Sequence, residues 1–325
     1  MLDKKKLLIC GATGFVGRNL AEHFSQQDGF EVFSIYHRRP TFECSGLQWI
    51  YADLTRSEDV ERCIRGMDII VQAAATTSGS KDIVNRPYIH VTDNALMNSL
   101  IFRASYEHKV SNVVFFSCSV MYPSSLTPLK ETDFNADEEL HANYYGVGWT
   151  KVYLEKMCEF FSRLGPTRYT VLRHSNIYGP HDKFDLEHSH VFGATMTKVL
   201  CSTNGKVVVW GEGKEERDLL YMSDLIRFVH LAIEKQDNAF CLCNVGYGRS
   251  FSVKDLVQKI ITASKKKITI EYDVSQPSIP TRLALDCTKA KKIFDWEPKI
   301  SLATGIKKTI EWYQSNIVAE SLDNK

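Results

Sequence analysis

The chain has 325 residues and a mass of 37.1 kDa, enough for one large domain or two modest ones with a full hydrophobic core. Hydrophobic residues make up 44% and charged residues 24% of the sequence, a balance that excludes disordered and fibrous proteins. Lysine and arginine (40) nearly equal aspartate and glutamate (39), and the net charge of +1 excludes the broad basic surface of a nucleic-acid or membrane-surface protein.

The first half of the chain alternates strand-like and helix-like segments. Short apolar runs predict strands at 6–10, 31–36, 47–51, 68–74, 112–118 and 169–173. Amphipathic stretches between them predict helices at 16–27, 57–65, 91–108 and 151–163. Because helices that connect successive strands make those strands parallel, this order predicts an α/β fold with a doubly wound parallel sheet. We expect this domain to span residues 1–175.

The last third of the chain is richer in helix. Strands are predicted at 207–210 and 240–245, and helices at 225–234, 253–264 and 302–316. This pattern predicts a smaller α/β substrate lobe over residues 176–325. We expect some of its strands and helices to return to the first domain.

A glycine-rich turn lies between the first predicted strand and the first predicted helix. In the sequence GATGFVG, Gly11 would allow a tight turn, Gly14 a close approach to a pyrophosphate, and Gly17 close packing of helix on strand. The helix N-terminus would then offer free N–H groups to phosphates. A purely structural glycine turn is the alternative. We expect a Rossmann-type dinucleotide site whose contacts come from Gly11, Thr13, Gly14, Phe15, Val16 and Gly17.

The segment after the second strand bears on cofactor choice. NAD sites usually place a carboxylate there for the ribose 2′-OH, whereas NADP sites place an arginine for the 2′-phosphate. This chain has Arg38 and Arg39 and no carboxylate, which favours NADP over NAD. The alternative is that both arginines are solvated and that NAD binds without a carboxylate. Further cofactor contacts are expected after the third and fourth strands, from Asp53, which would accept from the adenine amine, Leu54, Ala73, Ala74 and Ala75.

Later motifs resemble the extended short-chain dehydrogenases/reductases that modify nucleotide sugars. Asn94 lies in a helix that matches the family, and RHSNIYGP at Arg173–Pro180 is similar to its segment between cofactor and sugar nucleotide. The run YGPHDKFD followed by Ser189-His190-Val191 resembles the GDP-sugar branch, the GDP-L-fucose synthases and related enzymes. The similarity continues through Arg217 and the segments 209–211, 221–224, 295–298 and 306–312.

The resemblance implies a nicotinamide cofactor in the first domain and a GDP-linked sugar in the second. It identifies Lys151 with the family lysine, which holds the cofactor ribose. It also implies a homodimer that pairs helices 91–108 and 151–163, with no nucleic-acid or membrane partner. The substrate-binding residues that we expect on this basis are Asn176, Phe184, His190, Val191, Trp210, Arg217 and Arg282.

The catalytic motif departs from the family pattern. The family places a tyrosine four residues before its lysine, so that both lie on one helical face. Here that position is Val147, while Tyr145 and Tyr144 lie six and seven residues before Lys151, about 9–10 Å away along a helix axis. The usual serine position holds Cys118, with Ser119 beside it.

Three interpretations of the proton transfer remain open. A backbone distortion at Gly146 or Gly148 would bring Tyr145 or Tyr144 close to Lys151. Proton transfer would otherwise run through Cys118, His190 or water. In the third case proton transfer is weak and the protein mainly binds nucleotides.

We expect an NAD(P)-dependent oxidoreductase that moves a hydride at C4 of a GDP-linked hexose or heptose, as a 4-dehydrogenase or 4-keto reductase. A 4-epimerase with a tightly held cofactor and a catalytically silent homologue are the alternatives. His188 and His190, with Asp185 or Glu187 nearby, lack a third strong ligand at motif spacing, so no metal is expected.

The cysteines and the N-terminus bear on the compartment. Nine scattered cysteines without a C-x-x-C motif predict reduced thiols, and Cys241 and Cys243 would face the same side of a strand. No stretch approaches the ~20 apolar residues that span a bilayer. The apolar run 7–10 is too short for a signal peptide. We expect a cytoplasmic protein.

Overall fold

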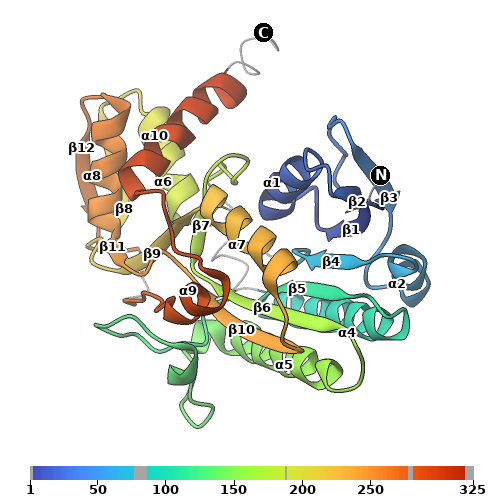
Figure 1. The fold of residues 1–325 in the computed structure, drawn as a ribbon. Helices are drawn as coiled ribbons and strands as arrows, with labels where there is room; N and C mark the ends of the chain where they lie inside the picture. The colour runs from blue at the N-terminus through green and yellow to red at the C-terminus, as the bar shows by residue number, and fades with distance from the viewer. Residues whose placement is uncertain (1–2, 77–85, 187–188, 277–280, 319–325) are drawn as a thin grey trace.

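A seven-stranded sheet, with all its strands parallel, forms the centre of the larger lobe (Figure 1). The computed structural model describes residues 3–76, 86–186, 189–276 and 281–318. The strand order is β10-β6-β5-β4-β1-β2-β3. These strands are β1 (Lys5–Cys10), β2 (Phe30–Tyr36), β3 (Leu47–Tyr51), β4 (Ile69–Gln72), β5 (Asn112–Phe116), β6 (Arg168–His174) and β10 (Phe240–Val245). The chain order reverses between β1 and β4, so the crevice at their carboxyl ends is the switch point where open α/β sheets bind ligands.

Helices cover both faces of this sheet (Figure 1). One face packs against α1 (Phe15–Phe24), α7 (Met222–Lys235) and α9 (Thr288–Phe294), and the other against α2 (Ser57–Ile64), α4 (Thr92–Glu107) and α5 (Tyr145–Ser162). In β1 the side chains alternate between the two hydrophobic cores, with Leu7 and Ile9 in the first and Leu8 and Cys10 in the second. Burial on both faces explains why these strands are continuous apolar runs in the sequence.

The smaller lobe has two short sheets. In the first, β9 (Glu216–Tyr221) pairs with β7 (Asn176–Tyr178) in parallel and with β11 (Ser250–Ser252) antiparallel. In the second, β8 (Lys206–Trp210) and β12 (Thr269–Asp273) are parallel. A third hydrophobic core joins these sheets to α6 (Val191–Leu200), α8 (Val253–Ser264) and α10 (Leu302–Tyr313). Short helical turns complete the described chain: η1 (Pro87–His90), η2 (Glu131–Asp133), η3 (Ala142–Tyr144) and η4 (Gln314–Val318).

The chain crosses between the two lobes several times. After β9, the chain enters α7 and β10 of the large sheet before it returns through β11 and α8. The carboxylate of Asp218 on β9 fixes this crossing, because it accepts hydrogen bonds from the amides of Tyr247 (2.7 Å), Gly248 (3.0 Å) and Leu285 (3.1 Å). The two lobes are therefore tied together at the carboxyl edge of the large sheet.

The predicted α/β fold with a doubly wound parallel sheet is confirmed, with small shifts in element ends. Strand β4 ends at Gln72, two residues before the predicted end, because the side chain of Gln72 contacts the amide and carbonyl of Ala74. Helix α5 begins at Tyr145, six residues earlier than predicted. Cys241 and Cys243 do face one side of β10, with their Sγ atoms 3.4 Å apart. Across the described ranges, every helix is too short or too polar to cross a membrane.

Candidate active site

Two glycines of the turn after β1 are required by the backbone. Gly11 has φ +81°, and a Cβ on it would lie 2.7 Å from the Cα and the amide nitrogen of Ala74. A Cβ on Gly17 would lie 2.1 Å from the carbonyl oxygen of Gly11, so only glycine lets α1 pack this closely against the turn. The spacing of the motif thus reflects two contacts that tolerate no side chain.

Gly14 lies at the end of the same turn, directly before α1. Its φ is −96°, and the nearest atom to an added Cβ would be the Gly11 carbonyl oxygen at 3.3 Å, so packing within the chain does not by itself demand glycine here. Helix α1 starts at the next residue, has no side-chain capping bond and has no acidic residue in its first turn. An open backbone surface beside an uncapped helix N-terminus fits a pyrophosphate.

The segment after β4 forms the neighbouring wall. Ala74 lies directly against Gly11, and Ala73 and Ala75 keep this wall free of bulky side chains. Asn94 on α4 fixes the segment, because its carboxamide accepts from the Thr76 amide (2.9 Å) and donates to the Thr76 carbonyl (3.1 Å).

The segments after β2 and β3 carry positive charge. Arg38 and Arg39 are exposed after β2. The hydroxyl of Thr55 donates to Asp53 at 2.7 Å and helps to hold the pKa of that carboxyl below its usual value. His37 lies 3.8 Å from the other carboxylate oxygen of Asp53. The buried Leu54 follows, so these segments offer one carboxylate that is already engaged and two exposed guanidinium groups.

Lys151 and Cys118 meet at the carboxyl end of β5. The Nζ of Lys151 donates to the Phe116 carbonyl at 2.7 Å and lies 4.7 Å from the centroid of the Phe115 ring. Burial lowers the pKa of this lysine. Burial raises the pKa of the Cys118 thiol, and the charge of Lys151 opposes that effect only in part. Cys118 is therefore a neutral thiol at pH 7.

Helix α5 is regular where the sequence allowed a distortion. The residues from Tyr145 through Gly148 are α-helical, so the first of the three interpretations, a backbone distortion at Gly146 or Gly148, does not hold. Both glycines instead relieve packing, since a Cβ would lie 2.9 Å from Val91 at the first and 2.8 Å from Leu140 at the second. Tyr145 is 56% exposed and lies about 120° around the helix from Lys151.

Tyr144 has a different environment from its neighbour. It ends the turn η3 and is half-buried. Its phenol is close enough to Arg217 of β9 to interact with the guanidinium charge. The first of the two tyrosines therefore lies near β9 of the smaller lobe.

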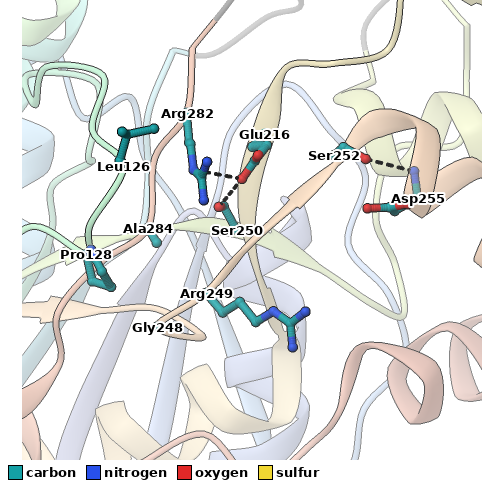
Figure 2. Close-up of a pocket in the computed structure, with 10 residues that line it drawn as sticks. All are labelled: Leu126, Pro128, Glu216, Gly248, Arg249, Ser250, Ser252, Asp255, Arg282 and Ala284. Atoms are coloured by element: carbon teal, nitrogen blue, oxygen red, sulfur yellow. Dashed lines mark hydrogen bonds and ion pairs between the residues drawn. The ribbon is translucent and has the colours of Figure 1, made fainter.

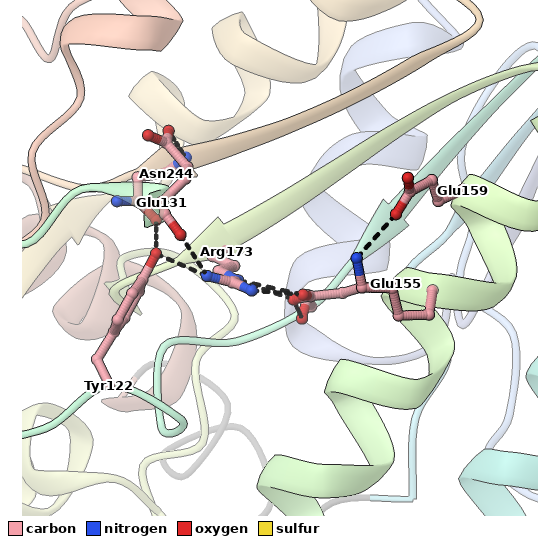
Figure 3. A network of polar contacts seen from close by, with 8 residues as sticks. Tyr122, Glu131, Glu155, Glu159, Arg173 and Asn244 are labelled. Atoms are coloured by element: carbon pink, nitrogen blue, oxygen red, sulfur yellow. Dashed lines mark hydrogen bonds and ion pairs between the residues drawn. The ribbon is translucent and has the colours of Figure 1, made fainter. Parts of the chain in front are cut away.

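A buried polar network joins α5 to β6 (Figure 3). Its centre is the ion pair of Glu155 on α5 with Arg173 on β6, at 2.7 Å, and both side chains are about 95% buried. Glu155 also accepts from Ser117, and Arg173 donates to the hydroxyl of Tyr122 at 2.9 Å. Sequence analysis missed the pair of Glu155 with Arg173. The spacing Lys151-x-x-x-Glu155 could have drawn attention to Glu155, because it puts Glu155 on the same helical face as Lys151. The network is completed by Asn244 and Glu131.

Two histidines, His190 and His174, lie close enough to each other to interact electrostatically. His190 precedes α6, and its side chain makes no capping bond. It keeps an accessible surface, yet surrounding protein atoms lower its pKa by desolvation, and Lys183 adds to the effect. His174, at the end of β6, was missed by sequence analysis, because it lies one residue beyond the predicted strand and only the fold brings it near Lys151. Burial lowers its pKa to about 4, and the charges of Lys151 and His190 contribute.

The smaller lobe presents part of the expected substrate set. Arg217 is half-buried, and its Nη1 donates to the Thr281 carbonyl at 3.0 Å. Asn176 donates to the Asp218 carbonyl at 3.3 Å. Val191 begins α6 beside His190, and Trp210 at the end of β8 is 49% exposed.

Phe184 is held by α10. Its ring stacks on Trp312 with centroids 5.9 Å apart and meets Tyr313 edge-on at 5.0 Å. These contacts anchor the segment before α6 to the C-terminal helix, which gives Phe184 a packing role alongside the expected place in a sugar pocket.

Arg282 lies beside Glu216 and Ser250 (Figure 2). Its Nε is 3.1 Å from a carboxylate oxygen of Glu216, which also accepts from the hydroxyl of Ser250. These residues line a pocket of about 330 Å³ with Arg249. Because successive side chains of β9 point to opposite faces, Arg282 and Arg217 lie on opposite sides of that strand.

Within the described ranges, no three side chains of the metal-binding types come together. His188 and Glu187, which were considered as ligands, lie outside the described residues. All nine cysteines are described, and each is a free thiol.

The fold and the glycine turn define a dinucleotide-binding protein of the Rossmann type. The sequence profile of the NAD dependent epimerase/dehydratase family matches residues 7–246, and the chain belongs to this family. The family resemblance inferred from the sequence is thereby confirmed, and the chain is an NAD(P)-dependent enzyme that modifies nucleotide sugars.

Known relatives match along the whole chain. GDP-L-fucose synthase of Azorhizobium caulinodans is 30% identical, over 95% of this chain and 96% of its own length. GDP-L-colitose synthase of Yersinia pseudotuberculosis is 25% identical, over 95% and 97%. A crystal structure of UDP-glucose 4-epimerase from Thermotoga maritima with UDP-glucose superposes with a TM-score of 0.85 at 25% identity, over 96% of this chain and 99% of that one.

Proposed function

We propose that the protein transfers a hydride between NAD(P) and C4 of a GDP-linked hexose or heptose, as a 4-dehydrogenase or 4-keto reductase. The observation that carries the proposal is the position of Lys151, whose buried Nζ lies at the carboxyl end of β5 in the sheet that bears the glycine turn. The names of the GDP-L-fucose and GDP-L-colitose synthases support guanosine diphosphate as the carrier.

The cofactor would lie across the carboxyl ends of β1 and β4, where it would supply a hydride acceptor or donor. The turn from Gly11 to Gly17 would hold the pyrophosphate. Arg39 and Lys183 support NADP over NAD, because they are close enough for the charge of Arg39 to add to the burial that lowers the pKa of Lys183. A phosphate near Arg39 would relieve this repulsion, and Arg38 would add a second guanidinium.

The sugar nucleotide would bind between the same edge and the smaller lobe. Arg217 would contact the diphosphate, since a half-buried guanidinium suits that group. The exposed ring of Trp210 would pack against the base, with Asn176 nearby on β7. His190 and Val191 would approach the sugar.

A homodimer is part of the proposal. Leu96 on α4 is 49% exposed, and Tyr153 and Phe160 on α5 are 56% and 55% exposed. Since α4 and α5 pack against each other, a second copy of this pair would cover these apolar side chains.

A 4-epimerase is the second candidate. It is favoured by the close structural similarity to UDP-glucose 4-epimerase, at a TM-score of 0.85. Such an enzyme would keep its cofactor through the cycle and would need no added cosubstrate.

Mass spectrometry of the small molecules released by denaturing the purified protein separates these candidates. An empty protein that then reduces NADP with a GDP-hexose supports the dehydrogenase, whereas NAD retained in a 1:1 ratio supports the epimerase. The Lys151→Met variant controls for reduction by contaminants. The absence of any absorbance change with GDP-mannose, GDP-glucose and a GDP-heptose, despite cofactor binding, would point to a silent nucleotide-binding protein.

A further inference from the structure

His174 occupies a position that the proposed function leaves without a role. It is the last residue of β6, next to the end of β5 in the sheet, where the Ser117 amide donates to the Leu172 carbonyl at 2.9 Å. Its ring packs on Phe116, with centroids 6.0 Å apart, and the Phe116 carbonyl is the acceptor for Lys151. One residue of β5 thus contacts both the imidazole and the lysine.

The hydrogen bond of His174 fixes its tautomer. Its Nδ1 lies 2.7 Å from the Ser175 carbonyl oxygen, which can only accept, so Nδ1 carries the hydrogen. In the neutral ring Nε2 then bears a lone pair, and it has no partner among the described residues. His174 keeps part of its surface exposed, and we infer that a ligand reaches this nitrogen from that side.

The surroundings keep His174 neutral. Besides burial, the charges that act on the ring come from Lys151 on α5 and from His190 in front of α6, while Phe116 on β5 is uncharged. Burial and these charges put the pKa at about 4, so the imidazole is a free base at pH 7. Cys118 keeps its proton at this pH, because burial raises the pKa of the thiol.

We propose that Nε2 of His174 accepts the proton of the sugar hydroxyl, a role that Val147 cannot perform. This assignment rests on the proposed function. In the oxidation, the C4–H bond breaks and its electron pair leaves as a hydride to the oxidised nicotinamide. The O–H bond breaks at the same time, its proton bonds to the Nε2 lone pair, and the carbon–oxygen double bond forms. The sugar is oxidised, the nicotinamide is reduced, and the imidazolium then releases its proton to water.

Nitrogen NMR of the histidine-labelled wild-type protein without cofactor tests the chemical state. The signal that disappears in His174→Asn is expected to show hydrogen on Nδ1 and a bare Nε2, and to stay unchanged from roughly pH 5 to 8. A signal with hydrogen on Nε2, or one that titrates near the usual histidine value, would overturn the proposal.

Kinetics of the purified protein test the role. The substitution His174→Asn keeps a donor for the Ser175 carbonyl but removes Nε2, so kcat should fall about 10²–10⁴-fold while KM for the GDP-sugar changes little. His108→Asn is the matched control, because His108 is half-buried, bonded to Glu61 at 2.6 Å and located at the end of α4, whereas His174 is at the carboxyl end of β6.

The two proposals fail in different ways. A wild-type protein that reduces no cofactor with any GDP-sugar overturns the proposed function and this assignment together. A wild-type protein that turns over, with His174→Asn equally fast, overturns the assignment of His174 alone. A loss of kcat in His174→Asn that comes with a raised KM and a lowered melting temperature also overturns the assignment of His174, because the residue is then structural.

Discussion

The two halves of the site are determined by different physical constraints. In the cofactor turn, backbone geometry decides the residue type, because Gly11 has a positive φ and Gly17 has no space for a Cβ. At the proposed catalytic edge, the carboxyl end of β5 and β6, the site is formed by side chains from separate elements. Lys151 comes from α5, Cys118 from the end of β5 and His174 from β6. Backbone constraints can be read from one short motif, whereas convergent side chains become visible only in the folded chain.

The comparison also explains where this chain can depart from its family. Replacing a tyrosine by Val147 leaves the helix regular and the sheet intact. In our proposal, the departure changes the proton carrier and leaves the glycine turn that would hold the cofactor unchanged. The following substitutions test each half separately, from the largest expected effect to the smallest.

The Glu155–Arg173 ion pair is expected to matter most for stability. Glu155→Gln leaves the buried guanidinium of Arg173 without its counter-ion, so the free energy of unfolding should fall by about 3–5 kcal/mol in urea titrations. Glu159→Gln, which breaks ion pairs with Lys156 and Arg163 at the surface of the same helix, should cost below about 1 kcal/mol. Equal losses in the two variants would contradict the role of the network.

Lys151 should be essential for catalysis. Lys151→Met removes the charge while it keeps the length of the side chain, and we expect hydride transfer to fall at least about 100-fold, as for other positioned acid–base groups. Cofactor reduction monitored by absorbance gives the rate. Lys156→Met, five residues further along α5 and exposed, should retain the wild-type rate. A fully active Lys151→Met would refute the placement of the catalytic edge.

The glycine turn should not tolerate the addition of a single methyl group. Gly17→Ala puts a Cβ against the Gly11 carbonyl, so we expect a loss of about 1–3 kcal/mol in stability and weaker binding of NADPH. Thermal unfolding and fluorescence titration measure the two effects. Gly29→Ala, where nothing lies within 4 Å of the new methyl group, is the control. Unchanged NADPH affinity in Gly17→Ala would place the cofactor elsewhere.

A substitution at Arg39 should change the preference for NADPH over NADH, by less than the effects above. Arg39→Ser removes one guanidinium from the proposed 2′-phosphate site, which should weaken NADPH binding about 10-fold and leave NADH binding unchanged, as expected for one hydrogen bond to a charged group. Arg103→Ser, on the surface of α4 and paired with Glu107, should change neither affinity. A parallel loss for both cofactors would refute the NADP preference.

Much of the fold could be predicted from the sequence, because strands buried on both faces are continuous apolar runs and the glycine motif marks the first crossover. The site was harder to predict. Helix α5 begins six residues before its predicted start, and Gly146 and Gly148, where a distortion was one interpretation, instead allow close packing against Val91 and Leu140.

Contacts between distant segments account for the other differences. Nothing in the sequence places His174 beside Phe116 and Lys151, because neighbouring strands of a parallel sheet are separated by a helix. For the same reason the packing of Phe184 on Trp312 could not be foreseen. The pairing of Arg282 with Glu216 likewise required the three-dimensional structure.

The central claim is hydride transfer at C4 of a GDP-linked sugar, and isotope transfer tests it most directly. GDP-hexoses carrying deuterium at C4 would be incubated with the protein and oxidised cofactor, and the reduced cofactor would be analysed by mass spectrometry. We expect deuterium to appear in the reduced nicotinamide, and to be lost when the label is placed at C3 or when Lys151→Met is used. Reduced cofactor without deuterium, or label arriving from another carbon, would contradict the account.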